Sequence, residues 1–216
     1  MIRNNTSEQK TGKTGRVSKA ALGLRAHSGW SALVVVTGTA SLPRVIDRRR
    51  IELIDSTILG AAQPYHAAEE MPLKEAEKYI SRCVARTRLL ARQAIGSVIE
   101  KMRRNDVDIV GCGFLLSSAK PLPVLEGILA SHPLIHTAEG VFFRDAIADA
   151  SEHHGLPIIK VKERELYSVV TARFGLTEEE LQKRISDLGR ELGPPWRQDE
   201  KFSTIVGLLA LASTSK

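Results

Sequence analysis

The stretch between residues 21 and 54 constrains the fold more than any other part of this sequence. It reads ALGLRAHSGWSALVVVTGTASLPRVIDRRRIELI, so two apolar runs flank a Ser-Gly turn and a third run follows Pro43. Apolar runs of strand length on either side of a short turn predict a β-hairpin. We therefore expect strands over 20–26, 31–37 and 45–54. The third strand mixes polar and apolar residues on both of its sides, which is typical of a sheet edge.

Two helical regions and two more strands are expected next along the chain. Apolar residues recur at spacings of three and four over 73–104, which predicts a helix with one packed face. Residues 107–116 are almost continuously apolar, as expected for a central parallel strand that is covered on both faces. A second helical region starts near Pro121 and has its main helix over 137–154, and a short fifth strand is expected over 156–161.

The C-terminal third of the chain is expected to be helical. Helices are predicted over 163–174, 177–193 and 199–212, and Thr177 with Glu180 three residues later forms a capping box at the start of the second. The full order is β-β-β-α-β-α-β-α-α-α. This alternation predicts an α/β fold, and its length is compatible with one domain over residues 19–216.

Most of the positive charge of the chain lies at its N-terminus. The formal net charge is +6, and residues 1–19 hold five basic side chains and one acidic side chain, which supply +4 of it. A polar segment rich in Asn, Thr, Lys and Gly cannot bury enough apolar surface to become ordered. We therefore expect residues 1–18 to be a disordered basic tail, serving either as a solubilising leader or as an arm that binds nucleic acid.

The sequence contains no candidate membrane segment. No run of about 18 apolar residues is present, and no apolar segment follows the basic N-terminus, so we expect a cytoplasmic protein with no membrane partner. The two cysteines, Cys83 and Cys112, fall in segments expected to be buried. They are therefore predicted to be free core thiols, and no cysteine-based metal site is indicated.

The order of elements resembles that of ribonuclease H-like domains, which include Holliday junction resolvases and actin-like ATPases. The resemblance covers about residues 20–213 and rests on three strands in a meander followed by two strands that join in parallel through helices. It implies a mixed five-stranded sheet (β-β-β-α-β-α-β-α) with extra C-terminal helices. In the nucleases of that superfamily, acids in the first strand, at the end of the fourth strand and in the last helix together hold two divalent metals.

The chain departs from that nuclease pattern at two of the three places. The acidic position of the first strand falls on or next to Arg25, and the fourth strand has no carboxylate between residue 111 and Glu126. Only the last helix keeps acids, namely Asp199 and Glu200. Because an arginine repels the metal that an aspartate would hold, we expect the fold without two-metal nuclease activity.

The predicted anion-binding residues are Arg25, Ser28, Arg144 and Arg197. Arg25 and Ser28 lie where the first strand ends, which is where open α/β sheets usually receive ligands. An arginine offers a fork of donors that fits a carboxylate or a phosphate. The alternative is that Arg25 and His27 lie on a solvent-facing side of the strand and Ser28 only helps to turn the hairpin.

The predicted catalytic residues are His27, His66, His136 and Lys201. His66 follows a proline in QPYHAAEE, where it could act as a base oriented by Glu69. His136 precedes Thr137, a suitable helix N-cap, and would share that helix end with Glu139. The alternatives are a solvated loop for His66 and a purely capping role for the residues around Thr137.

A metal site is conceivable with His27, His66 and His136 as ligands, because imidazole suits zinc and related metals. No pair among these three has the spacing H-x-x-x-H, so we assign no metal ligands. A divalent metal is the only cofactor that the residues suggest. The sequence shows no G-x-x-x-x-G-K-[ST], G-x-S-x-G or G-x-G-x-x-G motif.

The lead hypothesis is a ribonuclease H-like domain that lacks the nuclease carboxylates and binds an anionic ligand, with nucleic acid as one candidate. The first alternative is a hydrolase or nuclease-like enzyme that uses the His, Arg and Lys residues at the end of the first strand. The second is a structural or oligomerisation module. The sequence leaves open the substrate, the reaction and whether the chain forms homo-oligomers.

Overall fold

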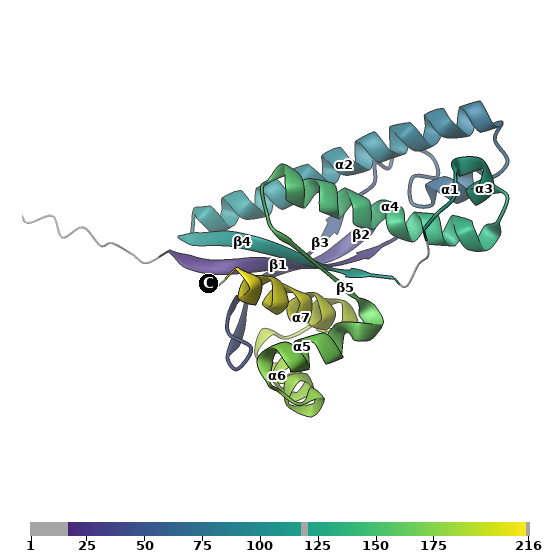
Figure 1. Ribbon diagram of the computed structural model, residues 1–216. Coiled ribbons are helices and arrows are strands. Elements are labelled where there is room, and N and C mark those ends of the chain that lie inside the picture. The colour runs from purple at the N-terminus through teal and green to yellow at the C-terminus, as the bar shows by residue number, and fades with distance from the viewer. Residues whose placement is uncertain (1–16, 118–120, 215–216) are drawn as a thin grey trace, which may run out of the picture.

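A mixed five-stranded sheet forms the centre of the molecule (Figure 1). The computed structural model describes residues 17–117 and 121–214. The order in the sheet is β3-β2-β1-β4-β5, in which β1 to β3 are antiparallel and β4 and β5 run parallel to β1. The predicted sheet and the edge position of its third strand are confirmed. The strands are β1 (Ser18–His27), β2 (Trp30–Gly38), β3 (Pro43–Glu52), β4 (Val107–Leu116) and β5 (Ile158–Lys162).

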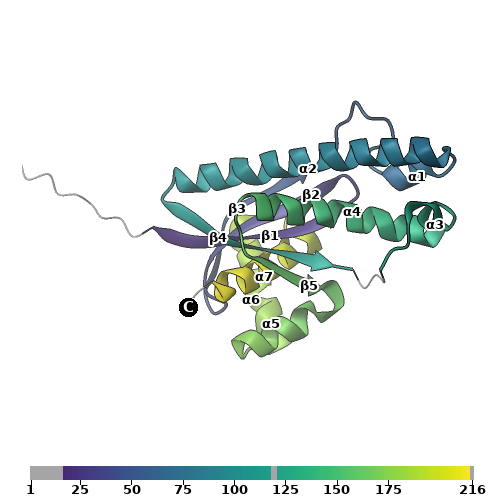
Figure 2. The ribbon, with the colours of Figure 1, turned by 45° about the horizontal axis from the view of Figure 1, so that its top comes forward.

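Helices cover both faces of the sheet, as Figures 1 and 2 show. One face packs against α2 (Leu73–Arg103) and α4 (His132–His153), and the other against α7 (Gln198–Ser213) with α5 (Leu166–Phe174) and α6 (Glu178–Leu192) beyond it. The short elements are α1 (Pro64–Ala68), α3 (Leu125–Leu129) and the 3-10 turn η1 (Glu163–Glu165).

The predicted disordered tail, residues 1–18, falls almost wholly outside the described residues. Ser18 is described, and the prediction is wrong for it because it is the first residue of β1. Its backbone N–H donates to the carbonyl oxygen of Asp106 at 3.0 Å, and it pairs with Val107 of β4. Backbone pairing therefore orders this residue despite its polar neighbours in the sequence.

The start of α4 was also predicted wrongly. The helix begins at His132, so Thr137 lies inside it and its hydroxyl donates to the carbonyl oxygen of Pro133. Pro133 belongs to the first helical turn, where its fixed φ favours the helix and its missing N–H costs nothing. The capping box of Thr177 and Glu180 at the start of α6 is confirmed.

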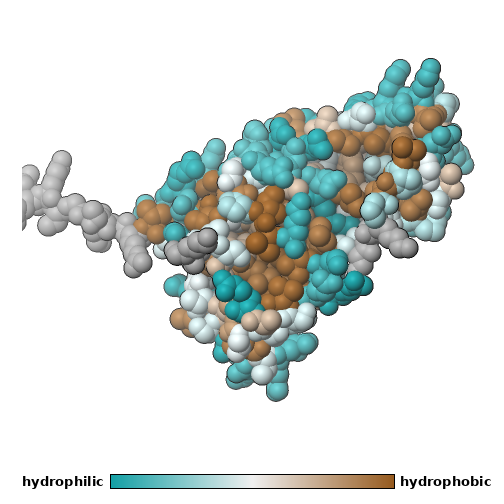
Figure 3. Space-filling view, in the orientation of Figure 1, coloured by the Kyte–Doolittle hydropathy of each residue, from teal (hydrophilic) through white to brown (hydrophobic). Residues whose placement is uncertain are grey.

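The edge strand β5 carries an apolar groove of about 390 Å³ on its surface. Figure 3 shows hydrophobic side chains gathered on this side of the molecule, where Figure 1 has β5 and α7. The apolar side chains that line the groove are Leu116, Ile159, Val161, Val169 and Leu209.

No helix among the described residues is long and apolar enough to cross a bilayer. Cys83 and Cys112 are buried and free, as predicted.

Two glycines let α7 lie directly against the centre of the sheet. A Cβ atom on Gly23 of β1 would overlap the carbonyl oxygen of Ser203, and one on Gly113 of β4 would overlap that of Val206. The helix backbone therefore fills the space that side chains would otherwise take. Since Arg25 follows Gly23 on the same face of β1, this close approach brings the first turn of α7 beside Arg25.

We predict that Gly113→Ala will destabilise the protein by about 2 kcal/mol or more, because the added methyl overpacks a backbone contact. Urea unfolding followed by circular dichroism measures the loss. Gly111→Ala is the matched control on the same strand, since a Cβ there would lie 3.4 Å from the nearest atom, Thr214 Cγ2. Equal losses in the two variants would show that the approach of α7 does not require the glycine.

Candidate functional site

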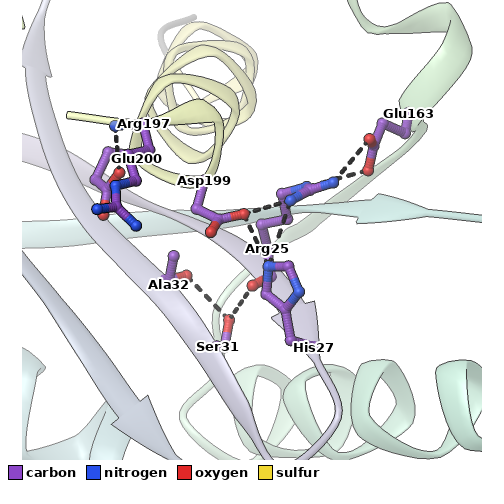
Figure 4. A network of polar contacts seen from close by, with 8 residues as sticks. All are labelled: Arg25, His27, Ser31, Ala32, Glu163, Arg197, Asp199 and Glu200. Carbon is purple, nitrogen blue, oxygen red and sulfur yellow. Dashed lines mark hydrogen bonds and ion pairs between the residues drawn. The ribbon is translucent and has the colours of Figure 1, made fainter. Parts of the chain in front are cut away.

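Arg25 lies near the end of β1 between two carboxylates from other elements (Figure 4). Its Nε and Nη2 donate to the two carboxylate oxygens of Glu163, at 3.1 and 2.9 Å. Its Nη1 donates to Oδ1 of Asp199. Glu163 directly follows β5 and Asp199 lies in the first turn of α7. The Arg25 side chain is 19% exposed. Its guanidinium therefore links β1 to the end of β5 and to α7.

His27 shares the same aspartate. Its Nε2 lies 2.8 Å from Oδ1 of Asp199, as Figure 4 shows. Its ring stacks on that of Trp30 across the hairpin, with centroids 4.3 Å apart and planes 12° from parallel. The stacking and the carboxylate together fix the orientation of the imidazole.

The charges in this network stabilise one another. Burial alone would raise the pKa of Asp199, but hydrogen bonds from Arg25 and His27 outweigh it and lower that pKa below its usual value. Burial would lower the pKa of Arg25, but the hydrogen bonds to Glu163 and Asp199 raise it instead. The arginine therefore stays charged with its donors directed at the protein's own carboxylates.

A polar cavity of about 250 Å³ lies next to this network, between the end of β1 and α4. His27 lines it from β1 and His136 lines it from α4, so the structure brings these two predicted catalytic residues to one cavity. The cavity is lined by Ala26, His27, Ser28, Gln63, His136, Glu139, Gly140 and Phe143.

His66 adjoins the cavity through Glu139. Glu139 of α4 is only 3% exposed, and one of its oxygens accepts from the backbone N–H of His66 at 3.2 Å and contacts its Nδ1 at 2.8 Å. The expected partner of His66 was Glu69, and that expectation is wrong. Glu69 instead lies near His132, with its Oε1 3.9 Å from Nδ1 of that ring. The short helix α1, which the sequence analysis did not predict, places His66 beside Glu139 of α4.

The structure adds His132, which the sequence analysis did not select. Its Nε2 lies 3.1 Å from Nε2 of His136. The two residues form an H-x-x-x-H spacing, and this was the signal that could have identified the pair. The predicted helix start at Thr137 left both residues outside the helix, where a spacing of four has no geometric meaning.

Two of the remaining predicted residues, Arg197 and Lys201, do not line the cavity, and a third, Ser28, does. Arg197 is exposed at the N-cap of α7, where its backbone N–H donates to Glu200 at 2.7 Å, and Figure 4 shows it on the opposite side of Asp199 from Arg25. Lys201 is half-buried on α7 and is not among the residues that line the cavity. Ser28 is exposed in the hairpin turn, where it lines the cavity.

Arg144 of α4 differs from Arg25 because no carboxylate of the described residues lies within 4.0 Å of its guanidinium. Its Nη2 donates to Oγ of Ser117, just after β4, at 2.8 Å. Burial lowers the pKa of Arg144, and the charges of Asp145 and Glu163 only partly offset this. The same Nη2 lies beside Gly140, which lines the cavity. A half-buried cation in this situation favours the approach of an anion.

Comparisons with known proteins identify the fold. No protein-family model matches the chain, and no curated protein matches it. Among solved structures it is similar to RuvC from Thermus thermophilus in complex with a Holliday junction substrate, with a TM-score of 0.53 and 12% identity over 90% of this chain and 94% of that one. The chain has the ribonuclease H-like fold. A second structure of RuvC from Thermus thermophilus gives a TM-score of 0.50 and 11% identity over 91% of this chain and 97% of that one.

The structure brings Asp199 of the last helix, one of the acids noted in the sequence, into direct contact with Arg25 of the first strand. Glu163, the other partner of Arg25, was not predicted. It follows the fifth strand, and the carboxyl ends of parallel strands meet at one edge of the sheet, which is the signal that could have identified it.

We predict that Arg25→Gln will lower the free energy of unfolding at pH 7 by about 2 kcal/mol, because charge-assisted hydrogen bonds are lost. The difference in unfolding free energy between Arg25→Gln and the unchanged protein should become smaller in acid. Because the pKa of Asp199 is lowered in the folded state, its stabilisation is complete above the unfolded-state pKa near 3.9 and is lost as the pH falls through the folded-state pKa. Urea unfolding at pH 7 and at about pH 3 measures both effects.

Arg164→Gln is the matched control for this prediction. Arg164 pairs with Glu165 at 3.4 Å on the surface, one residue after Glu163, and its side chain is 66% exposed. An exposed pair of this kind contributes about 0–1 kcal/mol. A loss in Arg25→Gln that is no larger than in the control, or that is the same at both pH values, would contradict the assigned role of Arg25.

Proposed function

We propose that this ribonuclease H-like domain binds an anionic ligand at the carboxyl ends of β1 and β4 and does not perform two-metal hydrolysis. Phosphate groups of a nucleic acid are the ligand class favoured. The observation behind the proposal is the ion pairing of Arg25 with Glu163 and Asp199, which puts the chain's own cation among the carboxylates at this end of the sheet.

The residues present do not fit a pair of divalent metals. A hard cation needs free carboxylate oxygens, whereas the Oδ1 of Asp199 already accepts from Arg25 and lies 2.8 Å from Nε2 of His27. A guanidinium at contact distance from the same oxygens also repels a metal ion by direct Coulomb interaction. The carboxyl end of the fourth strand adds no acid, because residues 109–116 carry no carboxylate. Metal-dependent phosphodiester cleavage therefore lacks its ligands at this position.

Binding of an anion is supported by Arg144. Its side chain is half-buried beside Gly140, a residue that lines the cavity, and its guanidinium donates to the hydroxyl of Ser117 rather than to a carboxylate. A phosphate oxygen would supply the charge-assisted hydrogen bonds that this group lacks. The net charge of +6 favours the same class of ligand over long range. The similar RuvC structure is described as bound to a Holliday junction substrate, so junction DNA is the first nucleic acid to test.

We predict that Arg144→Gln will weaken binding to a labelled four-way DNA junction by roughly tenfold, and will reduce the slope of log affinity against log salt by about 1. Fluorescence anisotropy over a salt series measures both quantities, with duplex and single-stranded DNA of the same composition run in parallel. The N-terminal residues are present in every variant, so their contribution cancels in the comparison.

Arg190→Gln is the matched control, since Arg190 lies on α6 with a side chain that is 79% exposed and pairs with Asp187. It should leave the affinity unchanged within about twofold, because its charge is exposed and away from the cavity. If Arg144→Gln binds as tightly as Arg190→Gln, or if the unchanged protein binds none of the three nucleic acids at low salt, the proposed ligand site is wrong.

We predict no cleavage of junction, duplex or single-stranded DNA when Mg²⁺ or Mn²⁺ is supplied, because the carboxylates needed by the metals are engaged. Denaturing gel electrophoresis of end-labelled strands checks this. Asp199→Asn separates the chain's own activity from contamination. Metal-dependent cleavage that disappears in Asp199→Asn would overturn this part of the proposal.

The alternative of a hydrolase that uses histidines is favoured by one observation, namely that His27 and His136 line the same cavity. The cleavage assay also distinguishes this alternative. Cleavage that persists in a chelator and is lost in His27→Gln would support the hydrolase, because a positioned imidazole transfers protons without a metal.

A further inference from the structure

We propose that His66, His132 and His136 bind one divalent transition-metal ion, with zinc as the metal that fits best. One ring nitrogen from each of the three side chains lies within 4.8 Å of the others. The site lies between α1 and α4, separate from the carboxylates that Arg25 engages. It does not rest on the proposed binding of nucleic acid.

The distances suit a tetrahedral ion. Zinc bonds to imidazole nitrogen at about 2.0–2.1 Å, so two nitrogens on one tetrahedral zinc lie about 3.4 Å apart. The Nε2 atoms of His132 and His136 are already 3.1 Å apart. The ring of His66 has its centroid 4.6 Å from that of His136 and 5.1 Å from that of His132. The set therefore needs only a small adjustment to surround one ion.

The three rings meet edge to face, and one nitrogen of each lies within 4.8 Å of the others. The three pairs have interplanar angles of 65°, 78° and 82°, whereas stacked rings would present their faces to one another. The helix produces part of this arrangement, because residues four apart on α4 lie on the same side. The third ring comes from α1, where Pro64 begins the helix two residues before His66.

One carboxylate is hydrogen-bonded to a nitrogen that would not bind the metal, and a second carboxylate lies near another such nitrogen. Glu139 contacts Nδ1 of His66 at 2.8 Å, which leaves Nε2 of that ring as the free ligand atom. Glu69 lies 3.9 Å from Nδ1 of His132, whose Nε2 faces His136. A carboxylate behind a ligating imidazole fixes its tautomer and raises its basicity, and metal sites commonly use this arrangement. Glu139 is buried, so its orientation of His66 is set before any metal arrives.

The proposed ion would be open to solvent and to the cavity. His132 and His136 are exposed, and His136 lines the 250 Å³ cavity together with His27 and Ser28. Three protein ligands leave one position of a tetrahedral zinc free, which is the arrangement of catalytic rather than structural zinc sites. The free position would accept water or an anionic oxygen. The class of ligand taken by the site is therefore a transition-metal ion together with a small oxygen donor.

The test is Zn²⁺ binding to the untagged full-length chain after dialysis against a chelator. Isothermal titration calorimetry should show one equivalent bound, and thermal unfolding should shift to higher temperature because the ion binds the folded state. Co²⁺ as a spectroscopic probe should give the visible absorption of a tetrahedral site. His132→Gln and His136→Gln should each weaken Zn²⁺ binding at least roughly tenfold, and both residues are exposed, so neither change disturbs the core.

His153→Gln is the matched control, since His153 is exposed at the other end of the same helix beside His154. It should bind Zn²⁺ as the unchanged protein does. The proposal is overturned if the chain binds no Zn²⁺, if His132→Gln and His136→Gln both bind it unchanged, or if His153→Gln loses it to the same extent. DNA binding that fails while Zn²⁺ binding persists would reject the proposed function and leave the metal site standing.

Discussion

The guanidinium of Arg25, held between Glu163 and Asp199, is the interaction on which the site depends. Its partners lie 138 and 174 residues away in the sequence, so the pairing joins the first strand to the end of the fifth and to the last helix. A partly buried charge is stable only when it is paired and hydrogen-bonded, and here each charge satisfies the others. The same pairing occupies oxygens of Glu163 and Asp199. The proposal that the domain does not perform two-metal hydrolysis therefore rests on the interaction that also joins these three elements.

The cavity separates two polar groups of different character. On the side of β1, Arg25, His27 and Asp199 form an ionic network in which the charges are matched internally. On the side of α1 and α4, three imidazoles lie close together with one buried carboxylate behind them. The Nε2 atoms of His132 and His136 lie 3.1 Å apart, and a neutral imidazole keeps one nitrogen lone pair that a metal ion can take. Arg144 adds a cation that is unmatched by any carboxylate within 4.0 Å among the described residues, and a ligand could exploit both features.

Much of the fold was predictable from the sequence, and much of the site was not. Apolar periodicity gave all five strands and the long helices, because burial on one face or both leaves a pattern in neighbouring residues. The start of α4 was missed because Thr137 resembles an N-cap, whereas the helix begins at His132 with Pro133 in its first turn. That error hid His132. The pairing of Glu163 with Arg25 and of Glu139 with His66 depends on sheet order and on the packing of α1, which no local spacing encodes.

The two glycines beneath α7 have a consequence for how the site can change over evolutionary time. Backbone contacts at Gly23 and Gly113 hold the helix on the sheet independently of the side chain at position 25. The separation between position 25 and Asp199 is therefore framed by these backbone contacts as well as by the ion pair. A lineage could replace the residue at position 25 and change the charge of the site without moving the elements that frame it. The backbone of the fold keeps β1 and α7 close together, and the residue at position 25 determines whether a cation or an acid lies beside Asp199.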